Sequence, residues 1–171
     1  MPWSCADPAP SCSCRACARG TIGVVTLPED GDDAVRAAPL DRETVESLAR
    51  RYLGWLLLTE GTRAERLRAE AEVRVSEEVW SSVEHDADPF PLLDALVAQA
   101  VTSRDERLVA WLGAGLVEEA VVGRPDLAGR IAARCRAEPA WSEVVRGAWV
   151  DERRARDLPA PLRALVTVLK G

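Results

Sequence analysis

Hydrophobic residues recur every three or four positions from Leu40 onward, which is the spacing of one face of an α-helix. The pattern predicts a first helix with Asp41 as its N-cap and Gly61 as its stop signal. The apolar stripe of this helix consists of Val45, Leu48, Ala49, Tyr52, Leu53 and Leu56. A stripe of this width is typical of a helix that packs one side against a core.

Residues that begin and end helices divide the rest of the chain into further segments of the same kind. Thr62-Arg63-Ala64-Glu65 matches a capping box, and the helix that it opens should run to about Glu84. Later helix starts are expected at Asp88-Pro89, at Ser103-Arg104-Asp105-Glu106, at Pro125, at Pro139 and near Asp157. Short links place successive helices in opposite directions. The expected fold class is therefore all-α, a bundle of about seven or eight short antiparallel helices arranged as helical hairpins.

Residues 1–39 do not share the helical period. They hold five prolines, four cysteines and a run of acidic residues, with one short β-type segment over residues 21–27. Such a composition predicts a poorly ordered arm. We therefore expect two parts, a flexible Cys/Pro-rich arm over residues 1–39 and a helical domain over residues 40–171.

Composition and charge restrict the classes of partner. The 171 residues carry a net charge of −6, which does not favour general binding of nucleic acid. Acidic residues outnumber basic ones by 22 to 12 before residue 124, whereas the remaining residues hold 10 basic and 6 acidic side chains. No apolar run is long enough for a membrane span, and the first twenty residues lack the apolar part of a secretion signal. We therefore expect a cytoplasmic protein with no membrane partner.

A single lysine, no asparagine and abundant Arg and Ala are typical of a GC-rich, actinobacterial-like bacterial genome.

The stretch from residue 92 to residue 150 carries a recognisable pair of motifs. Residues 108–119 read LVAWLGAGLVEE, and a helix that begins near Trp141 leads to Gly147-Ala148-Trp149. This pair resembles a bacterial family of small helical domains of unknown function, whose motif has proline at the position of Leu116. The resemblance implies a small helical domain and supplies no activity.

Four cysteines of the arm lie within thirteen residues, namely Cys5, Cys12, Cys14 and Cys17. Thiolates are soft ligands that suit zinc or Cu(I), and four of them can complete a tetrahedral site. In a reducing cytoplasm such thiols are free or metal-bound rather than paired in disulfides. The spacing therefore suggests zinc or copper binding, or a thiol-redox role without metal. The alternative is a tail with incidental cysteines and no cofactor.

Other residues with chemical potential have simpler structural explanations. Cys135 lies on an apolar stripe, which predicts a buried thiol. His85, the only histidine, is expected in a loop before a helix start. Gly113-Ala114-Gly115 lacks the lysine and the preceding strand of a phosphate loop, and we expect a tight turn that ends a helix. Glu118 and Glu119 are adjacent, so their side chains do not converge for acid–base catalysis, and no catalytic residue is proposed.

The tryptophans have two possible roles. Trp80, Trp141 and Trp149 are expected on core stripes. Trp55 and Leu58 fall in a segment that is apolar nearly all round, which is either central in the bundle or exposed for a partner. Trp55 and Leu58 are therefore candidate partner-binding residues.

Two functional hypotheses follow. The leading one is a non-catalytic cytoplasmic protein-interaction module with another protein as its partner, such as an adaptor, a regulator or an immunity-type inhibitor. The alternative is a metal-binding or thiol-responsive protein that acts through the cysteine cluster of the arm.

Overall fold

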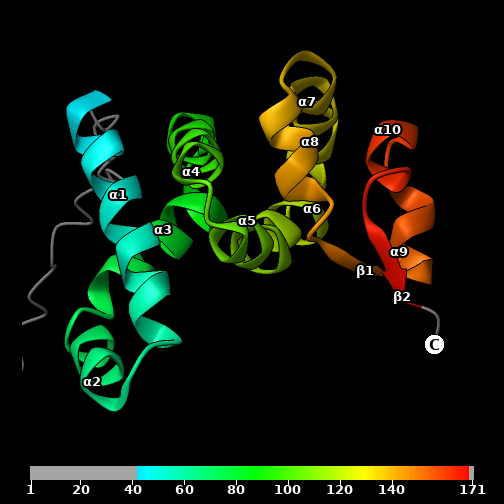
Figure 1. Cartoon of the computed structure of the whole chain (residues 1–171). Helices are drawn as coiled ribbons and strands as arrows, with labels where there is room; N and C mark the ends of the chain where they lie inside the picture. Colours follow the sequence, from blue (N-terminus) through cyan, green and yellow to red (C-terminus); the bar gives the residue numbers. More distant parts are fainter. Residues whose placement is uncertain (1–41, 170–171) are drawn as a thin grey trace, which may run out of the picture. The chain divides into compact units, whose positions relative to one another are not determined.

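The computed structural model describes residues 42–169, which are mostly helical with two short strands (Figure 1). The all-α fold class is confirmed at this level, while the antiparallel order of successive helices stays a prediction. Asp41 and the arm over residues 1–39 lie outside the described residues. In chain order the elements are α1 (Arg42–Thr59), α2 (Arg63–Ala71), α3 (Arg74–His85), α4 (Phe90–Ser103), α5 (Glu106–Leu112), a π-helical turn η1 (Gly113–Val117), α6 (Glu118–Gly123), α7 (Pro125–Ala137), α8 (Pro139–Val145), β1 (Trp149–Asp151), α9 (Glu152–Asp157), α10 (Ala160–Arg163) and β2 (Thr167–Leu169).

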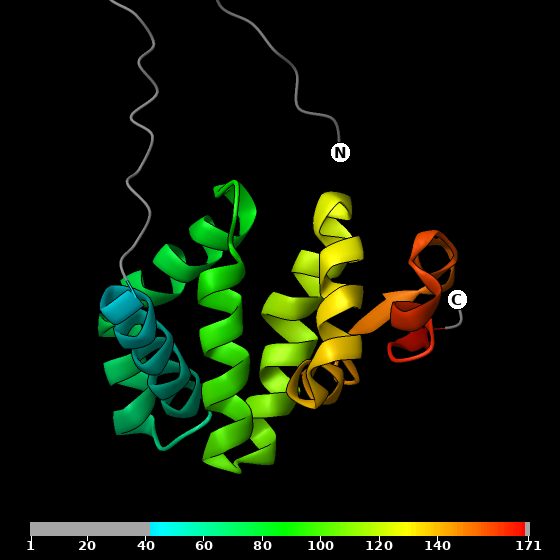
Figure 2. The same ribbon diagram turned by 90° about the horizontal axis from the view of Figure 1, so that it is seen from above.

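Helix α1 forms where the first apolar stripe predicts it. Five of the six stripe residues are buried, and Leu56 is partly buried against them. Helix α1 packs against α2, α3 and α4, and Figure 2 shows α1 and α4 side by side. Gly61 follows the end of the helix as expected, and its N–H donates to the carbonyl of Leu58 at 3.2 Å.

Several predicted helix starts are confirmed. The hydroxyl of Thr62 accepts the N–H of Glu65 at 3.3 Å while the Glu65 carboxylate accepts the N–H of Thr62 at 2.7 Å, so the capping box of α2 is complete. Helices α7 and α8 begin with Pro125 and Pro139. The expected capping box at residues 103–106 is wrong, because α5 begins later with Asp105 as its N-cap. In each case the residue beside the first helical turn decides the start.

The single helix expected over residues 62–84 is instead two helices. The break lies at Glu72 and Val73, where Glu72 has φ −103° and ψ 12° and leaves the α-helical region. The apolar i+4 series does not continue through it, because Leu67 is 56% exposed whereas Val75 and Val79 are buried. Since α2 buries only Ala69, a change of direction after α2 lets α3 bring its own apolar face to α1.

The expected turn at Gly113-Ala114-Gly115 is also wrong, because the chain stays helical from α5 through η1 into α6. Gly113 serves close packing instead. A side chain at Gly113 would overlap the carbonyl oxygen of Val144 and would lie 2.9 Å from the Cα of Gly147. The two glycines thus let η1 and the end of α8 approach backbone to backbone.

The last segment differs most from its prediction. The helix expected after Asp157 is a single turn, α10, followed by strand β2. Strand β2 pairs in parallel with β1, with Trp149 opposite Thr167 and Asp151 opposite Leu169. Trp149 is 55% exposed, so its placement on a core stripe is wrong, whereas Trp141 is fully buried as expected. Trp149 leaves the core because its backbone is extended, which turns its side chain away from the buried Val150 next to it.

No helix within residues 42–169 combines the length and the apolar character needed to cross a membrane.

Candidate functional site

A groove lies between α1 and α4 on the described surface, and we name it the α1–α4 groove. Its volume is about 840 Å³. The residues that line it are Val45, Glu46, Arg50, Pro91, Asp94, Ala95, Ala98, Gln99, Thr102 and Ser103. The amide of Gln99 donates to the backbone carbonyl of Glu46 at 3.1 Å and so links the two helices along the groove.

The sequence of α4 explains why the groove has an apolar floor. The helix buries one full face, which holds Leu92, Leu93, Leu96, Val97 and Ala100. Its opposite face carries small side chains, among them Ala95, Ala98 and Thr102, which leave space above the helix. Asp94 is the only charged residue among the fourteen of α4. The outward face of α4 is therefore almost uncharged, although surface helices normally direct charged side chains to solvent.

Asp94, the one charge of α4, is committed to the neighbouring helices. Its two carboxylate oxygens accept hydrogen bonds from Nε and Nη2 of Arg134 at 2.8 and 2.6 Å. The indole N–H of the buried Trp141 donates to the same carboxylate at 2.9 Å. The hydrogen bond with Asp94 raises the pKa of the Arg134 guanidinium. Asp94 therefore holds α4 to α7 and α8, and this explains its charge at the edge of an apolar groove.

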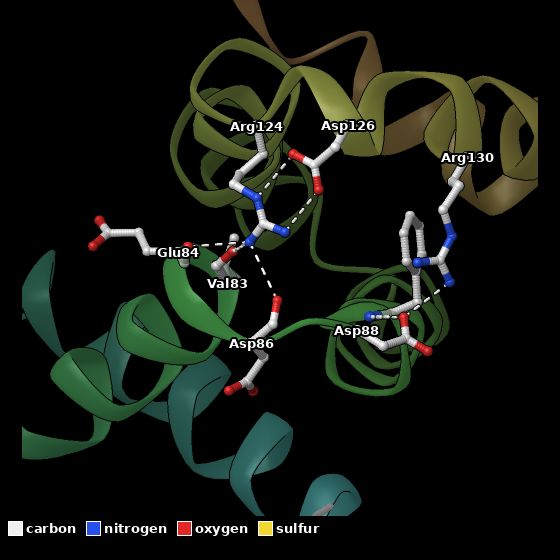
Figure 3. A network of polar contacts seen from close by, with 8 residues as sticks. Val83, Glu84, Asp86, Asp88, Arg124, Asp126 and Arg130 are labelled. Carbon is white, nitrogen blue, oxygen red and sulfur yellow. Dashed lines mark hydrogen bonds and ion pairs between the residues drawn. The ribbon is translucent and has the colours of Figure 1, made fainter. Parts of the chain in front are cut away.

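A second polar network closes the end of α3 (Figure 3). Nη1 of Arg124 donates to the backbone carbonyls of Val83, Glu84 and Asp86 at 2.9, 3.1 and 3.3 Å. Its Nε and Nη2 donate to Asp126 at 3.0 and 2.8 Å, and this hydrogen bonding raises the pKa of Arg124. The last carbonyls of a helix have no partner within it, so Arg124 supplies the donors from the junction of α6 and α7.

Beside this network, Arg130 connects α7 to the start of α4. Nη2 of Arg130 donates to Asp88 at 2.9 Å, as Figure 3 shows. The Arg130 guanidinium also lies 4.1 Å from the ring centre of Phe90, which is a cation–π contact. Asp88 also accepts the N–H of Phe90 at 3.3 Å, but the N-cap of α4 is Pro89, so the expected N-cap position of Asp88 is wrong. The contacts of Arg124 and Arg130 in Figure 3 thus connect neighbouring helices and have a structural role.

His85 lies at the end of α3, close to the carbonyls that Arg124 binds. Its side chain is 73% exposed, and its Nδ1 is 3.9 Å from a carboxylate oxygen of Glu84. In the part of the chain that the structure describes, no three His, Cys, Asp or Glu side chains are placed together to hold a metal ion. His85 ends a helix, whereas the sequence placed it in a loop.

Trp55 and Leu58, the predicted partner-binding residues, are both partly buried. The indole N–H of Trp55 donates to the carbonyl of Ala69 at 3.0 Å, which ties α1 to α2. The indole ring also stacks on Tyr52, with ring centres 5.7 Å apart. These contacts favour the packing alternative for Trp55, and the partner-binding role of both residues stays a prediction.

The other predicted residues are placed separately. Cys135 is half-buried rather than fully buried, and this burial raises the pKa of its thiol. A carboxylate oxygen of Glu118 accepts the N–H of Trp149 at 2.8 Å, so Glu118 supports strand β1. The cluster of Cys5, Cys12, Cys14 and Cys17 lies outside the described residues, and its metal site stays a prediction.

Reasoning from the sequence missed both the α1–α4 groove and the capping role of Arg124. A signal for the groove was present, since the fourteen residues of α4 contain a single charge. No local signal could identify Arg124, because its carbonyl partners lie 38 to 41 residues earlier in the chain.

No family model, curated protein or solved structure matches the chain, so the family resemblance of residues 92–150 stays a hypothesis.

Proposed function

We propose that the helical domain is a protein-interaction module that binds an amphipathic helical segment of a partner protein in the α1–α4 groove. The observation that carries this proposal is the outward face of α4, which is exposed yet lacks free charge. A helix that is hydrophobic on all sides is normally buried, and α4 approaches this case because its outward face carries small and uncharged side chains. The groove beside that face provides the space for such a cover.

The dimensions of the groove favour a helical ligand. Helix α4 has fourteen residues, which corresponds to a length of about 21 Å. Small side chains such as Ala95 and Ala98 permit a partner helix to approach closely, at the ~8 Å lower end of interaxial distances. Polar residues of α1, namely Glu46 and Arg50, lie at the opposite side of the groove. An apolar floor with a polar rim is the usual anatomy of a protein interface.

The substitution Ala98→Arg tests this proposal because it places a long charged side chain on the exposed floor of the groove. Ala133 of α7 is also an exposed helical alanine and does not line the groove, so Ala133→Arg is the matched control. A display library of amphipathic, helix-forming peptides of about 12–15 residues serves as the defined probe. Scrambled peptides of the same composition control for non-specific attraction.

We expect the unsubstituted chain and Ala133→Arg to enrich the same amphipathic peptides, and Ala98→Arg to bind them at least about tenfold more weakly. Enrichment of scrambled and amphipathic peptides alike would refute the proposal, as would equal binding to Ala98→Arg. Peptides that survive Ala98→Arg but are lost with Leu58→Ala would place the interface at Trp55 and Leu58 and would also refute the groove.

The cysteine cluster supports a second candidate function, binding of zinc or copper by the arm. Its support is the sequence spacing, since four soft ligands within thirteen residues suffice for a tetrahedral ion. Protein purified without oxygen is then expected to hold about one equivalent of metal, and Cys14→Ser to release it. Metal-free protein in which all thiols react freely would exclude this function.

A further inference from the structure

We infer that a second, smaller pocket between α6, α7 and α9 binds a free amino acid with an aliphatic side chain. The pocket has a volume of about 250 Å³. This lies just below the ~300–1,000 Å³ of pockets that enclose drug-sized ligands, so the space fits a molecule of the size of valine or leucine. The site is separate from the α1–α4 groove, with which it shares no residue.

The walls of the pocket are mostly apolar. Its apolar lining consists of Val121, Val122, Pro125, Ala128, Leu158 and Pro159. Val121, Ala128 and Leu158 are themselves buried, so their positions are fixed by the core. Such a lining accepts an aliphatic group and offers it no hydrogen bond.

Two side chains of opposite charge, Arg154 and Asp157, lie on the same pocket. They are three residues apart on α9, which places them on one face of the helix. Nevertheless, no ion pair joins them within the described residues, where Arg154 instead approaches Asp151, with Nε 3.5 Å from Oδ2. Both side chains are exposed, and within residues 42–169 neither the Nη atoms of Arg154 nor the carboxylate of Asp157 has a hydrogen bond or ion pair with the protein.

The pocket also includes two residues, Gly129 and Asp157, that lower the stability of the helices in which they lie. Gly129 lies inside α7, where glycine is a poorer helix former than alanine. Packing does not require this glycine, because a Cβ added there would meet no atom within 4 Å. Asp157 is the last residue of α9, the end at which a negative charge is unfavourable. Both residues are explained if they serve a ligand, Gly129 by leaving the space open and Asp157 by supplying charge.

A free aliphatic amino acid matches each of these features. Its carboxylate suits the planar guanidinium of Arg154, and its ammonium group suits the carboxylate of Asp157. Its aliphatic side chain then covers the apolar wall. Neither a fatty acid nor an amine would satisfy both charges, and glycine would leave the apolar wall uncovered.

The test is a nuclear magnetic resonance titration of the ¹⁵N-labelled full chain with L-leucine. Isovalerate keeps the aliphatic group and carboxylate, isoamylamine keeps the aliphatic group and ammonium, and glycine keeps only the two charges. We expect L-leucine to cause saturable shifts at Gly129, Arg154 and their neighbours, and each comparison compound to bind at least tenfold more weakly. This series needs no substitution, so it does not depend on the folding of any variant.

Three variants of pocket residues and one control variant locate the site. Arg154→Gln and Asp157→Asn remove one charge each at similar size, and both are expected to weaken L-leucine binding at least tenfold. Arg153→Gln changes the exposed neighbour on α9 that does not line the pocket, and it is expected to bind as the unsubstituted chain does. Gly129→Leu should abolish binding without loss of the folded spectrum.

Three results would overturn the inference. The first is the absence of saturable shifts with L-leucine, and the second is a set of shifts outside the pocket. The third is binding of isovalerate or isoamylamine as tight as that of L-leucine, since one charge would then suffice.

Discussion

Replacing Gly113 with alanine is expected to destabilise the helical domain, although alanine is the better helix former. The added Cβ would overlap the carbonyl oxygen of Val144 and lie 2.9 Å from the Cα of Gly147. Both are backbone atoms, so no side chain can rotate away to relieve the overlap. The helical segment around η1 and the end of α8 would have to separate.

The expected magnitude follows from two opposing effects. Overfilling a packed contact costs about 1–3 kcal/mol, and a clash with backbone belongs at the upper end of this range. The higher helix propensity of alanine offsets about 1 kcal/mol of this cost. The net loss in the free energy of unfolding is therefore about 2 kcal/mol, which lowers the melting temperature by about 8 °C for a domain of this size.

Gly115 provides the matched control for this experiment. It belongs to the same π-helical turn, but a Cβ at Gly115 would meet nothing within 4 Å. Thermal melts followed by far-ultraviolet circular dichroism should show a lower melting temperature for Gly113→Ala and an unchanged or higher one for Gly115→Ala. Equal melting temperatures for the two variants would show that η1 and α8 are not in backbone contact.

Three further predictions concern Tyr52, Trp55 and Asp94. Burial raises the pKa of Tyr52 from 10.0 to about 12, so the stability that its neutral phenol contributes is present below pH 10. About 2–3 kcal/mol of the free energy of unfolding should be lost between pH 10 and pH 12. Because the chain has one tyrosine, the absorbance of its phenolate reports this ionisation directly. An ionisation midpoint at pH 10 in the folded protein would contradict the prediction. Trp55→Ala should cost about 2–4 kcal/mol of stability in urea unfolding, whereas an unchanged midpoint would favour the partner-binding role. Asp94→Ala should cost about 1–3 kcal/mol because Arg134 and Trp141 lose their shared acceptor, and Asp94→Asn should restore part of it; equal stability of both variants would argue against the hydrogen bonds.

The features that the sequence predicts correctly depend on neighbouring residues. The capping box of Thr62 and Glu65 and the helix starts at Pro125 and Pro139 are each decided within one helical turn. The stripe of α1 is likewise visible because one face of one helix meets the core. Such signals give the helical class and many helix boundaries.

The features that the sequence misses depend on contacts between distant segments. The local sequence around Gly113 predicts the end of a helix. The residue instead permits close packing against Val144 and Gly147, which lie more than thirty residues later. Trp149 falls on an apparent helical stripe, but pairing of Val150 with Val168 draws the segment into a strand. Periodicity cannot distinguish these outcomes, because it counts apolar positions without knowing what they face.

The candidate sites show the same division. The single charge of α4 could have predicted an unusual outward face from the sequence alone. The groove beside that face needed the placement of α1, which only tertiary contacts supply. The sequence shows that Arg154 and Asp157 form an i, i+3 pair. It does not show that the pair lies beside the apolar wall formed by α6 and α7.

The dependence of α3 on Arg124 also has a consequence for the order in which the chain is made. Arg124 is synthesised 38 to 41 residues after the carbonyls that it satisfies. At ribosomal rates of about 5–20 residues per second, Arg124 is added about 2–8 s after the carbonyls at the end of α3. Water must solvate those carbonyls during this interval. A nascent chain that ends before Arg124 should therefore be cut by proteases near residues 83–86 more readily than one that already includes α8.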